Sequence, residues 1–415
     1  MESIVQGLIA EMRKMPVIDS HEHLPPEREL TSQSADIFTR IFAHYSPTNV
    51  ETAGLPDARA VILDTKRPLE ERWAIFRPFL SAVQDSGYVR AALIAARDLF
   101  GVEDINDETY LTLSERIQAA NTPGVYERIL KGKCGIERVL NQGTWDDGPR
   151  GYAVRVHRGF IDYRWNVAKD VCDVYRRWKE RHGGDFEDLD SWVDFWLGEI
   201  VRDGCVGVKH SAGRLAGPLD AAESARLFRK VRDGTLTDEE AARFSSWLAL
   251  KSVEKAPAHG LVAAFHCGLN WCCWQDFAPT DPMRMVPLLL RYRRTTFDLY
   301  HAGIPWVRQM AVIANQYPNA HLNLAWAHQI SPYMTENVLN EWLDLVPSNK
   351  IIGFGGDYHC GPEKTYGALV LARENIARAL AVRVARGQMT ESRAVQVCRA
   401  WLYENPRRIY GLDSR

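Results

Sequence analysis

Two histidines separated by a single residue, His21 and His23, carry the clearest chemical signal in this sequence. They follow Val17 and Ile18, which predict a short buried strand that ends before Pro25. Side chains at positions i and i+2 of a strand point to the same face, so both imidazoles would project together from the end of this strand. Two neutral imidazoles held in this way can bind one metal ion.

Similar residues recur where later strand-like runs end. A histidine follows each of five such runs, at His210, His266, His301, His328 and His359. Lys209 precedes the first of these histidines, and Asp357 lies two residues before the last. One histidine at a strand end is more often a hydrogen-bonded structural residue, so the joint pattern carries the prediction. Imidazole and carboxylate together suit zinc, and also manganese or iron.

Strand-like and helical stretches alternate along the chain, and this alternation would position the polar residues. After the first strand, strand-like runs are expected at residues 136–141, 152–157, 205–209, 261–266, 295–301, 320–327 and 351–355. Eight strands, each followed by helix, predict an α/β fold of the closed (β/α)8 TIM-barrel type, in which catalytic groups lie at the carboxyl ends of the strands. An open doubly wound sheet is the competing arrangement, but the chain has no G-x-G-x-x-G fingerprint and no P-loop.

Residues 30–131 contain no convincing strand, which indicates a helical insertion between the first and second strands. No internal repeat or linker is visible, so residues 1–415 are expected to form a single barrel domain that includes this insertion.

Composition narrows the class of protein. The chain has 415 residues, 46% of them hydrophobic, and a formal net charge of −2, which would not attract nucleic acid or a membrane surface. The first 14 residues predict a short amphipathic helix and not a signal peptide, and no apolar run is long enough to cross a bilayer. Eight cysteines without a secretion signal favour reduced thiols in the cytoplasm. We therefore expect a cytoplasmic homo-oligomer that acts on a small molecule.

Several stretches resemble the metal-dependent amidohydrolase superfamily, and in particular its amidohydrolase-2 branch. Residues 297–306, FDLYHAGIPW, are similar to the sixth strand of that branch; residues 326–332 and 355–358 are similar to its seventh and eighth. The ending at residues 405–412, NPRRIYGL, is similar to its C-terminal helix. The helical insertion resembles that of uronate isomerases.

This resemblance implies a set of site residues. His21 and His23 would be metal ligands from the first strand, and His266 a ligand from the fifth. His301 would be the sixth-strand catalytic histidine. Asp357, after the last strand, would bind the metal and also accept a proton from water.

Lys209 bears on the number of metal ions. In two-metal relatives a fourth-strand lysine is carboxylated and bridges the ions; otherwise Lys209 would bind a substrate anion or pair with a carboxylate. We predict one divalent ion, preferably Zn²⁺, with Mn²⁺ or Fe²⁺ as alternatives, and two ions if Lys209 is carboxylated. Arg158 could clamp a substrate carboxylate bidentately. His328 and Trp326 complete the expected substrate-binding residues.

The predicted reaction is hydrolysis. Zinc lowers the pKa of water from about 16 to about 7, so hydroxide forms at neutral pH. Asp357 would orient the water and take its proton, while the metal or His301 polarises the amide, lactone or related carbon of a small carboxylate-bearing molecule. A uronate isomerase-like sugar-acid isomerase ranks second, because Tyr358 and His359 follow Asp357 where those enzymes have a serine–arginine pair. A non-oxidative decarboxylase and a non-catalytic scaffold are the further alternatives.

Overall fold

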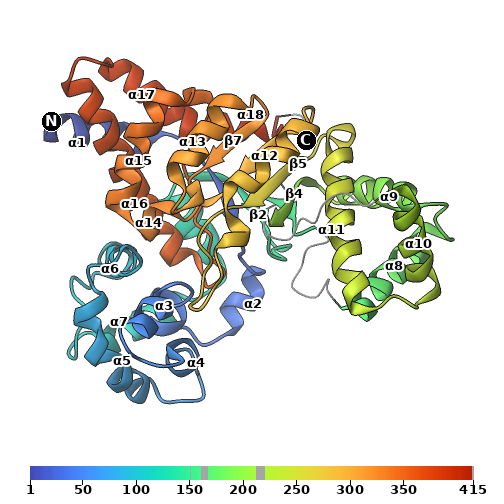
Figure 1. Cartoon of the computed structure of the whole chain (residues 1–415). Coiled ribbons are helices and arrows are strands. Elements are labelled where there is room, and N and C mark those ends of the chain that lie inside the picture. The colour runs from blue at the N-terminus through green and yellow to red at the C-terminus, as the bar shows by residue number, and fades with distance from the viewer. Residues whose placement is uncertain (150, 160–166, 212–219, 414–415) are drawn as a thin grey trace. The chain divides into compact units, whose positions relative to one another are not determined.

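Eight strands form one sheet in the part of the chain that the structure describes, and they follow one another in chain order from β1 to β8. The structure is a computed structural model that describes residues 1–149, 151–159, 167–211 and 220–413. The strands are β1 (Val17–Glu22), β2 (Ile136–Asn141), β3 (Ala153–His157), β4 (Cys205–Ser211), β5 (Val262–His266), β6 (Phe297–Leu299), β7 (Ala320–Asn323) and β8 (Ile351–Ile352). Helices separate them along the chain (Figure 1), so the predicted (β/α)8 barrel is confirmed.

The strand pairs are parallel, as β1 with β2 and each successive pair from β3 to β7 show. The backbone N–H of Leu324 donates to the carbonyl of Ile352 at 3.0 Å, next to β7 and β8. The N–H of Ser20 in β1 donates to the carbonyl of Phe354, just beyond β8, at 3.2 Å. Strand β1 is therefore hydrogen-bonded to the segment directly after β8, which brings the end of β1 close to that segment.

Contacts divide the chain into two compact units. The first contains Met1–Ala153, Leu269–Asp276 and Asn323–Pro406; the second contains Val154–Gly268, Phe277–Leu322 and Arg407–Arg415. The first unit holds β1, β2 and β8, and the second holds β4, β5 and β6. The expectation of a single domain over residues 1–415 stays a prediction.

In the first unit, the chain between β1 and β2 forms helices and turns without a strand. Its helices are α2 (Glu27–Ser32), η1 (Ile37–Ile41), α3 (Ser46–Thr52), α4 (Ala58–Ile62), α5 (Leu69–Val83), α6 (Gly87–Phe100), α7 (Tyr110–Ala120) and η2 (Glu127–Lys133). Helices α3 to α7 gather around one apolar core (Figure 1, blue to cyan) that includes Phe38, Phe42 and Phe76. That this stretch is an insertion stays a prediction.

Further α-helices of the first unit precede β1 or follow β7 in the chain. They are α1 (Glu2–Lys14), α14 (Ala327–Ile330), α15 (Pro332–Leu345), α16 (Pro362–Ala385) and α17 (Glu391–Arg399), and α18 (Asn405–Ile409) begins in this unit. Helix α16 packs closely on α6. A Cβ at Gly367 would lie only 2.0 Å from the carbonyl oxygen of Ala91, which shows how near the two backbones are. Only glycine permits the two backbones to come this near.

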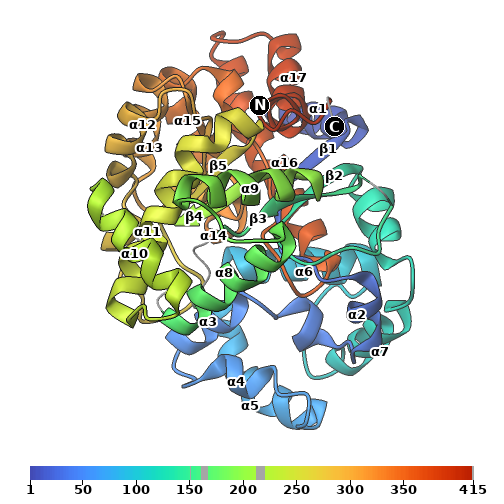
Figure 2. The same cartoon turned by 90° about the vertical axis from the view of Figure 1, so that its right-hand side faces the viewer.

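The second unit has a core of its own. Helices α8 (Ala168–His182), α9 (Leu189–Arg202), α10 (Ala221–Asp233) and α11 (Asp238–Lys255) lie together (Figure 2, green to yellow-green) around Trp192, Trp196 and Phe244. Helices α12 (Val286–Arg291) and α13 (Val307–Gln316) also belong to this unit. No helix in the described ranges combines the length and the hydropathy that crossing a bilayer requires.

Three of the predicted strands were too long at their carboxyl ends. The run predicted over residues 320–327 stops at Asn323, and Trp326 has a φ of +68°. The run over 295–301 stops at Leu299, and His301 has a φ of +67°. The run over 351–355 stops at Ile352. A residue in the left-handed region cannot continue a strand. The residues after each strand end are still largely apolar, so the hydrophobic pattern in the sequence did not show where the strand stops.

Candidate metal centre

Three potential ligand atoms meet in the first unit, from the end of β1 and the segment after β8. His21 Nε2 and His23 Nε2 lie 3.2 Å apart, and Asp357 Oδ1 lies 3.1 Å from the first and 3.3 Å from the second. A tetrahedral zinc ion with bonds of about 2.0–2.1 Å holds its ligand atoms roughly 3.3–3.4 Å apart. The triangle therefore has the dimensions of three corners of such a site, and the residues fit a divalent metal.

Gln142 orients the ring of His21. Its amide nitrogen lies 3.1 Å from His21 Nδ1, while its own buried oxygen Oε1 has no hydrogen-bond partner among the described residues. Turning the amide over exchanges oxygen and nitrogen, so that Nδ1–H donates to Oε1. That arrangement satisfies the unpaired oxygen of Gln142 and places the lone pair of the His21 ring on Nε2, the nitrogen that would bind a metal.

Asp357 has an unusual backbone conformation, with a φ of +62°. Its N–H donates to the carbonyl of His21 at 2.7 Å, and its own carbonyl accepts from the hydroxyl of Tyr45 at 2.9 Å. A non-glycine residue in the left-handed region costs about 1–2 kcal/mol and persists only where its surroundings hold it. These two contacts tie the backbone of Asp357 to β1 and to the residue that precedes α3.

Two buried carboxyl groups of β1 hold the peptide groups on either side of this aspartate. Asp19 Oδ1 accepts from the N–H of Gly356 at 3.1 Å, and Glu22 Oε2 accepts from the N–H of Tyr358 at 2.6 Å. Glu22 Oε1 also accepts from the hydroxyl of Thr365 at 2.8 Å. Burial raises the pKa of Asp19 to about 7 and raises that of Glu22 well above its usual range, the latter also through repulsion from Asp19.

Aromatic side chains pack behind the metal ligands. Trp326 is buried, and its ring stacks on Tyr45 with 4.3 Å between the ring centroids. His328 is also buried, with Nε2 2.8 Å from the carbonyl of Gly353 and Nδ1 3.2 Å from the amide of Asn375. Both ring nitrogens of His328 are thus engaged inside the protein. The expected substrate contacts of Trp326 and His328 stay predictions.

The other predicted site residues belong to the second unit. His266 and His301 lie side by side, with 4.4 Å between ring centroids, and Lys209 Nζ lies 4.4 Å above the ring of Tyr300. Arg158 follows β3 and is exposed. The roles expected for His266, His301 and Lys209 in metal binding and catalysis, and for Arg158 in substrate binding, stay predictions.

A buried hydrogen-bond network supports the tyrosine beneath Lys209. The hydroxyl of Tyr410 donates to Asp298 Oδ2 at 2.6 Å and lies 3.0 Å from the hydroxyl of Tyr300. Burial raises the pKa of Tyr410 well above its usual range, and the charge of Asp298 adds to the effect. The tyrosine hydroxyl therefore stays protonated and keeps both neighbours in place.

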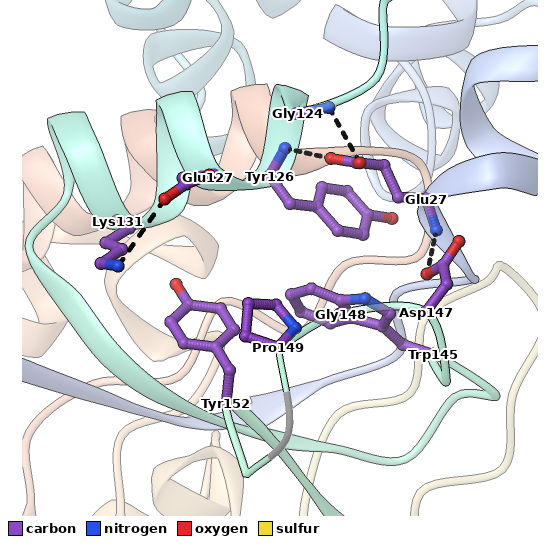
Figure 3. Close-up of a pocket in the computed structure, with 10 residues that line it drawn as sticks. All are labelled: Glu27, Gly124, Tyr126, Glu127, Lys131, Trp145, Asp147, Gly148, Pro149 and Tyr152. Atoms are coloured by element: carbon purple, nitrogen blue, oxygen red, sulfur yellow. Dashed lines mark hydrogen bonds and ion pairs between the residues drawn. The ribbon is translucent and has the colours of Figure 1, made fainter.

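A pocket lies elsewhere in the first unit, next to α2 and η2 (Figure 3). Tyr126, Trp145 and Tyr152 line it. Two of its carboxylates already accept hydrogen bonds from the backbone: Glu27 from the N–H groups of Gly124 and Tyr126, and Asp147 from the N–H of Glu27. The three metal-ligand candidates are not among its lining residues.

Sequence reasoning missed several of the residues described above. Gln142 directly follows β2, so its polar side chain at a strand end was the available signal. Glu22 lies between the two histidines and points to the opposite face of β1. It belongs to no motif in the sequence, so nothing there indicated its role. His44 and Tyr45 lie in the helical stretch after β1, and no periodicity connects them with the barrel.

Comparisons with known proteins agree with this fold. The family model described as Amidohydrolase matches residues 167–412. Protein fluG of Emericella nidulans is 28% identical over 137 residues, which cover 33% of this chain and only 16% of that protein.

Solved structures match the whole chain. A uronate isomerase from Thermotoga maritima has a TM-score of 0.78 at 16% identity and matches over 98% of this chain and 97% of its own. A glucuronate isomerase from Caulobacter crescentus has a TM-score of 0.76 at 19% identity, over 100% and 95%. A protein from Lactobacillus casei, described provisionally as a metal-dependent hydrolase, has a TM-score of 0.61 at 15% identity, over 97% of both chains. Likenesses at these identities show the shared fold.

Proposed function

Because this chain belongs to the amidohydrolase family, whose members depend on a divalent metal, we propose that it is a hydrolase of small carboxylate-bearing molecules. The triangle of His21 Nε2, His23 Nε2 and Asp357 Oδ1, with sides of 3.1–3.3 Å, carries the proposal. These three residues would hold the ion, and Zn²⁺ suits two imidazoles and one carboxylate.

A divalent ion bound there would acidify water and polarise a carbonyl group. Asp357 is the base of the proposed reaction: its carboxylate takes a proton from the attacking water and returns it to the leaving group. Burial, with His359 adding to it, lowers the pKa of His44 well below its usual range, so this neighbouring imidazole is neutral at pH 7. A neutral His44 does not carry the positive charge that would compete with the ion for the carboxylate of Asp357, which is the proposed base.

A sugar-acid isomerase is the second candidate. It is supported by the extent of the match to the Thermotoga and Caulobacter isomerases, which includes the helical stretch between β1 and β2. In an aldose–ketose interconversion, the carboxylate of Asp357 would move a proton between neighbouring carbons instead of taking one from water.

Metal content tests the proposed site. Purified wild-type protein should hold about one equivalent of divalent metal by elemental analysis, and Asp357→Asn should lose most of it, because the substitution removes an anionic ligand. Glu127→Gln, which changes an exposed carboxylate of η2, is the matched control and should keep the metal. A second equivalent that disappears in Lys209→Ala would indicate a bridging lysine. Wild-type protein that binds neither zinc nor manganese would contradict the proposal.

Products then distinguish the two reactions. The metal-loaded protein should be incubated with N-acyl amino acids and lactones, and separately with D-glucuronate and D-galacturonate. Release of an acid and an amine or alcohol supports the hydrolase. Formation of a ketose from either uronate, without hydrolysis of any member of the first panel, supports the isomerase and refutes the hydrolase.

A further inference from the structure

An arginine without a carboxylate partner lies close to the proposed metal ligands. Arg59, in α4, places its guanidinium 4.4 Å from the centroid of the Trp271 ring, and its Nη2 donates to the carbonyl oxygen of His44. Among the described residues no carboxylate forms an ion pair with it. Burial lowers the pKa of Arg59, although the guanidinium remains charged at neutral pH.

A half-buried arginine of this kind is unusual, because buried charges are normally paired. One face of its guanidinium packs on an indole ring, and one nitrogen is anchored on a backbone carbonyl. The side chain is therefore held in place. Glu51 is the carboxylate whose charge favours the guanidinium, but no ion pair joins these two described residues. A ligand carboxylate would supply a counter-ion through two parallel hydrogen bonds.

The segment that anchors Arg59 also contacts the metal-ligand region. The ring of His44 lies 4.0 Å from that of His359, two residues after Asp357, and 3.8 Å from the ring of Tyr45. Tyr45 in turn donates its hydroxyl to the carbonyl of Asp357 at 2.9 Å. All of these residues belong to the first unit. One residue, His44, therefore separates the unpaired guanidinium from the segment that carries the aspartate ligand.

His44 adds a second unsatisfied polar group. Its side chain is 8% exposed, and Nδ1 is buried without a hydrogen-bond partner among the described residues. An unpaired buried nitrogen is unfavourable, and a bound ligand or water that hydrogen-bonds to it would relieve this cost. Trp271, by contrast, is 38% exposed, so solvent reaches the wall on which Arg59 packs.

We infer that Arg59 binds the carboxylate of the substrate while the reacting carbon lies at the His21–His23–Asp357 centre, with His44 and Trp271 forming the wall of this subsite. The inference rests on the proposed function, since it describes the far end of the same substrate. It assigns to Arg59 the part that the sequence suggested for Arg158, and it defines the substrate class as acids whose carboxylate is separated from the reacting carbon by a short chain.

Hydroxamates test the subsite without knowledge of the substrate. Acetohydroxamate chelates a metal and has no second charge. The monohydroxamates of malonic, succinic, glutaric and adipic acid add a carboxylate at increasing distance, and the corresponding monohydroxamate amides are their neutral counterparts. Dissociation constants should be measured by calorimetry on the zinc-loaded protein, for wild type and for Arg59→Gln, Arg158→Gln and Arg77→Gln. Arg77 is an exposed arginine that pairs with Asp107 and serves as the matched control.

At one chain length or more, the wild type should bind the acid at least about tenfold more tightly than the amide, because a hydrogen bond to a charged group contributes about 1.5–3 kcal/mol. Arg59→Gln should abolish this preference and leave acetohydroxamate binding unchanged, which also shows that the variant is folded. Arg158→Gln and Arg77→Gln should keep the preference.

Three results would overturn the inference: no preference for any acid in the wild type, a preference that survives Arg59→Gln, or one that disappears only in Arg158→Gln. Failure of the proposed function looks different. Zinc-treated wild-type protein would then bind neither zinc nor acetohydroxamate, and the inference would fall with the metal centre.

Discussion

Single residues of the candidate centre are held by neighbours that never touch the metal position. Asp357 stays in the left-handed region because its N–H bonds to His21 and its carbonyl bonds to Tyr45. His21 is oriented by Gln142 from the end of β2. Such outer contacts typically change metal affinity by about 10- to 100-fold when they are removed. The ligand types were visible in the sequence, whereas their supports are a product of the fold.

The buried ring of His328 leads to a prediction about how the stability of the fold depends on pH. Burial lowers its pKa to about 4, against about 6.5 in an unfolded chain. Between these two pH values the unfolded state binds a proton that the folded state does not. The contribution of His328 to stability is therefore fully present above pH 6.5 and is lost as the pH falls towards 4. The free energy of unfolding should fall between pH 7 and pH 4 in both proteins. In His328→Gln we expect this fall to be smaller than in the wild type by up to about 3 kcal/mol.

Urea unfolding at several pH values measures this difference. His182→Gln, which changes an exposed histidine at the end of α8, should follow the wild-type pH dependence. If His328→Gln loses as much stability on acidification as the wild type does, then the buried ring is not kept neutral by the fold.

At the scale of elements, β1 controls the geometry of the segment after β8. Alternate residues at the end of β1 have different roles. His21, in β1, and His23, directly after it, point to the metal position. Glu22, between them, accepts hydrogen bonds from the N–H of Tyr358 and the hydroxyl of Thr365. A Cβ at Gly356 would lie 2.0 Å from Glu22 Oε1, so a side chain at this position would displace the Glu22 carboxylate from its present place.

Replacement of Glu22 tests this coupling between β1 and the segment after β8. Glu22→Leu should cost about 2–4 kcal/mol, because the N–H of Tyr358 and the hydroxyl of Thr365 lose their acceptor, and should weaken metal binding by about tenfold or more. Glu22→Gln keeps one acceptor oxygen and should lose less of both. Urea unfolding and zinc titration measure the two effects. Metal affinity at the wild-type level in Glu22→Leu would show that Asp357 does not depend on this support.

For the whole molecule, metal binding and stability are linked. Asp357 lies more than 330 positions from the other two proposed ligands, His21 and His23, and all three belong to one compact unit. An ion that binds only the folded state stabilises it by about 2.7 kcal/mol at a free concentration of 100 times Kd. The first thermal unfolding transition of the metal-free protein should therefore rise by roughly 5–10 °C on addition of zinc.

The same zinc addition should leave Asp357→Asn nearly unchanged, which makes this variant the control for non-specific effects of the ion. Calorimetric scans of both proteins, with and without zinc, provide the comparison. An equal rise in the two proteins would place the stabilising ion outside the proposed centre.

Much of the barrel was predictable from local properties of the chain. Alternation of apolar runs with helical periodicity predicted eight strands in the order that the sheet has, and the His21–His23 spacing correctly implied a shared face of β1. The ends of the strands were predicted less well. Trp326 and His301 adopt left-handed conformations soon after β7 and β6, and neither residue type indicates a turn in the sequence.

Residue types and their spacing thus determined the fold class and the kinds of ligand, because periodicity and side-chain chemistry are properties of short stretches. Only the tertiary structure decided which atoms meet. The hydrogen bonds between β1 and the segment after β8 bring Asp357 to within 3.1 Å of His21, and folding of the helical stretch brings Tyr45 and Arg59 to the same region. Such contacts depend on chain closure over hundreds of residues, which no local pattern in the sequence records.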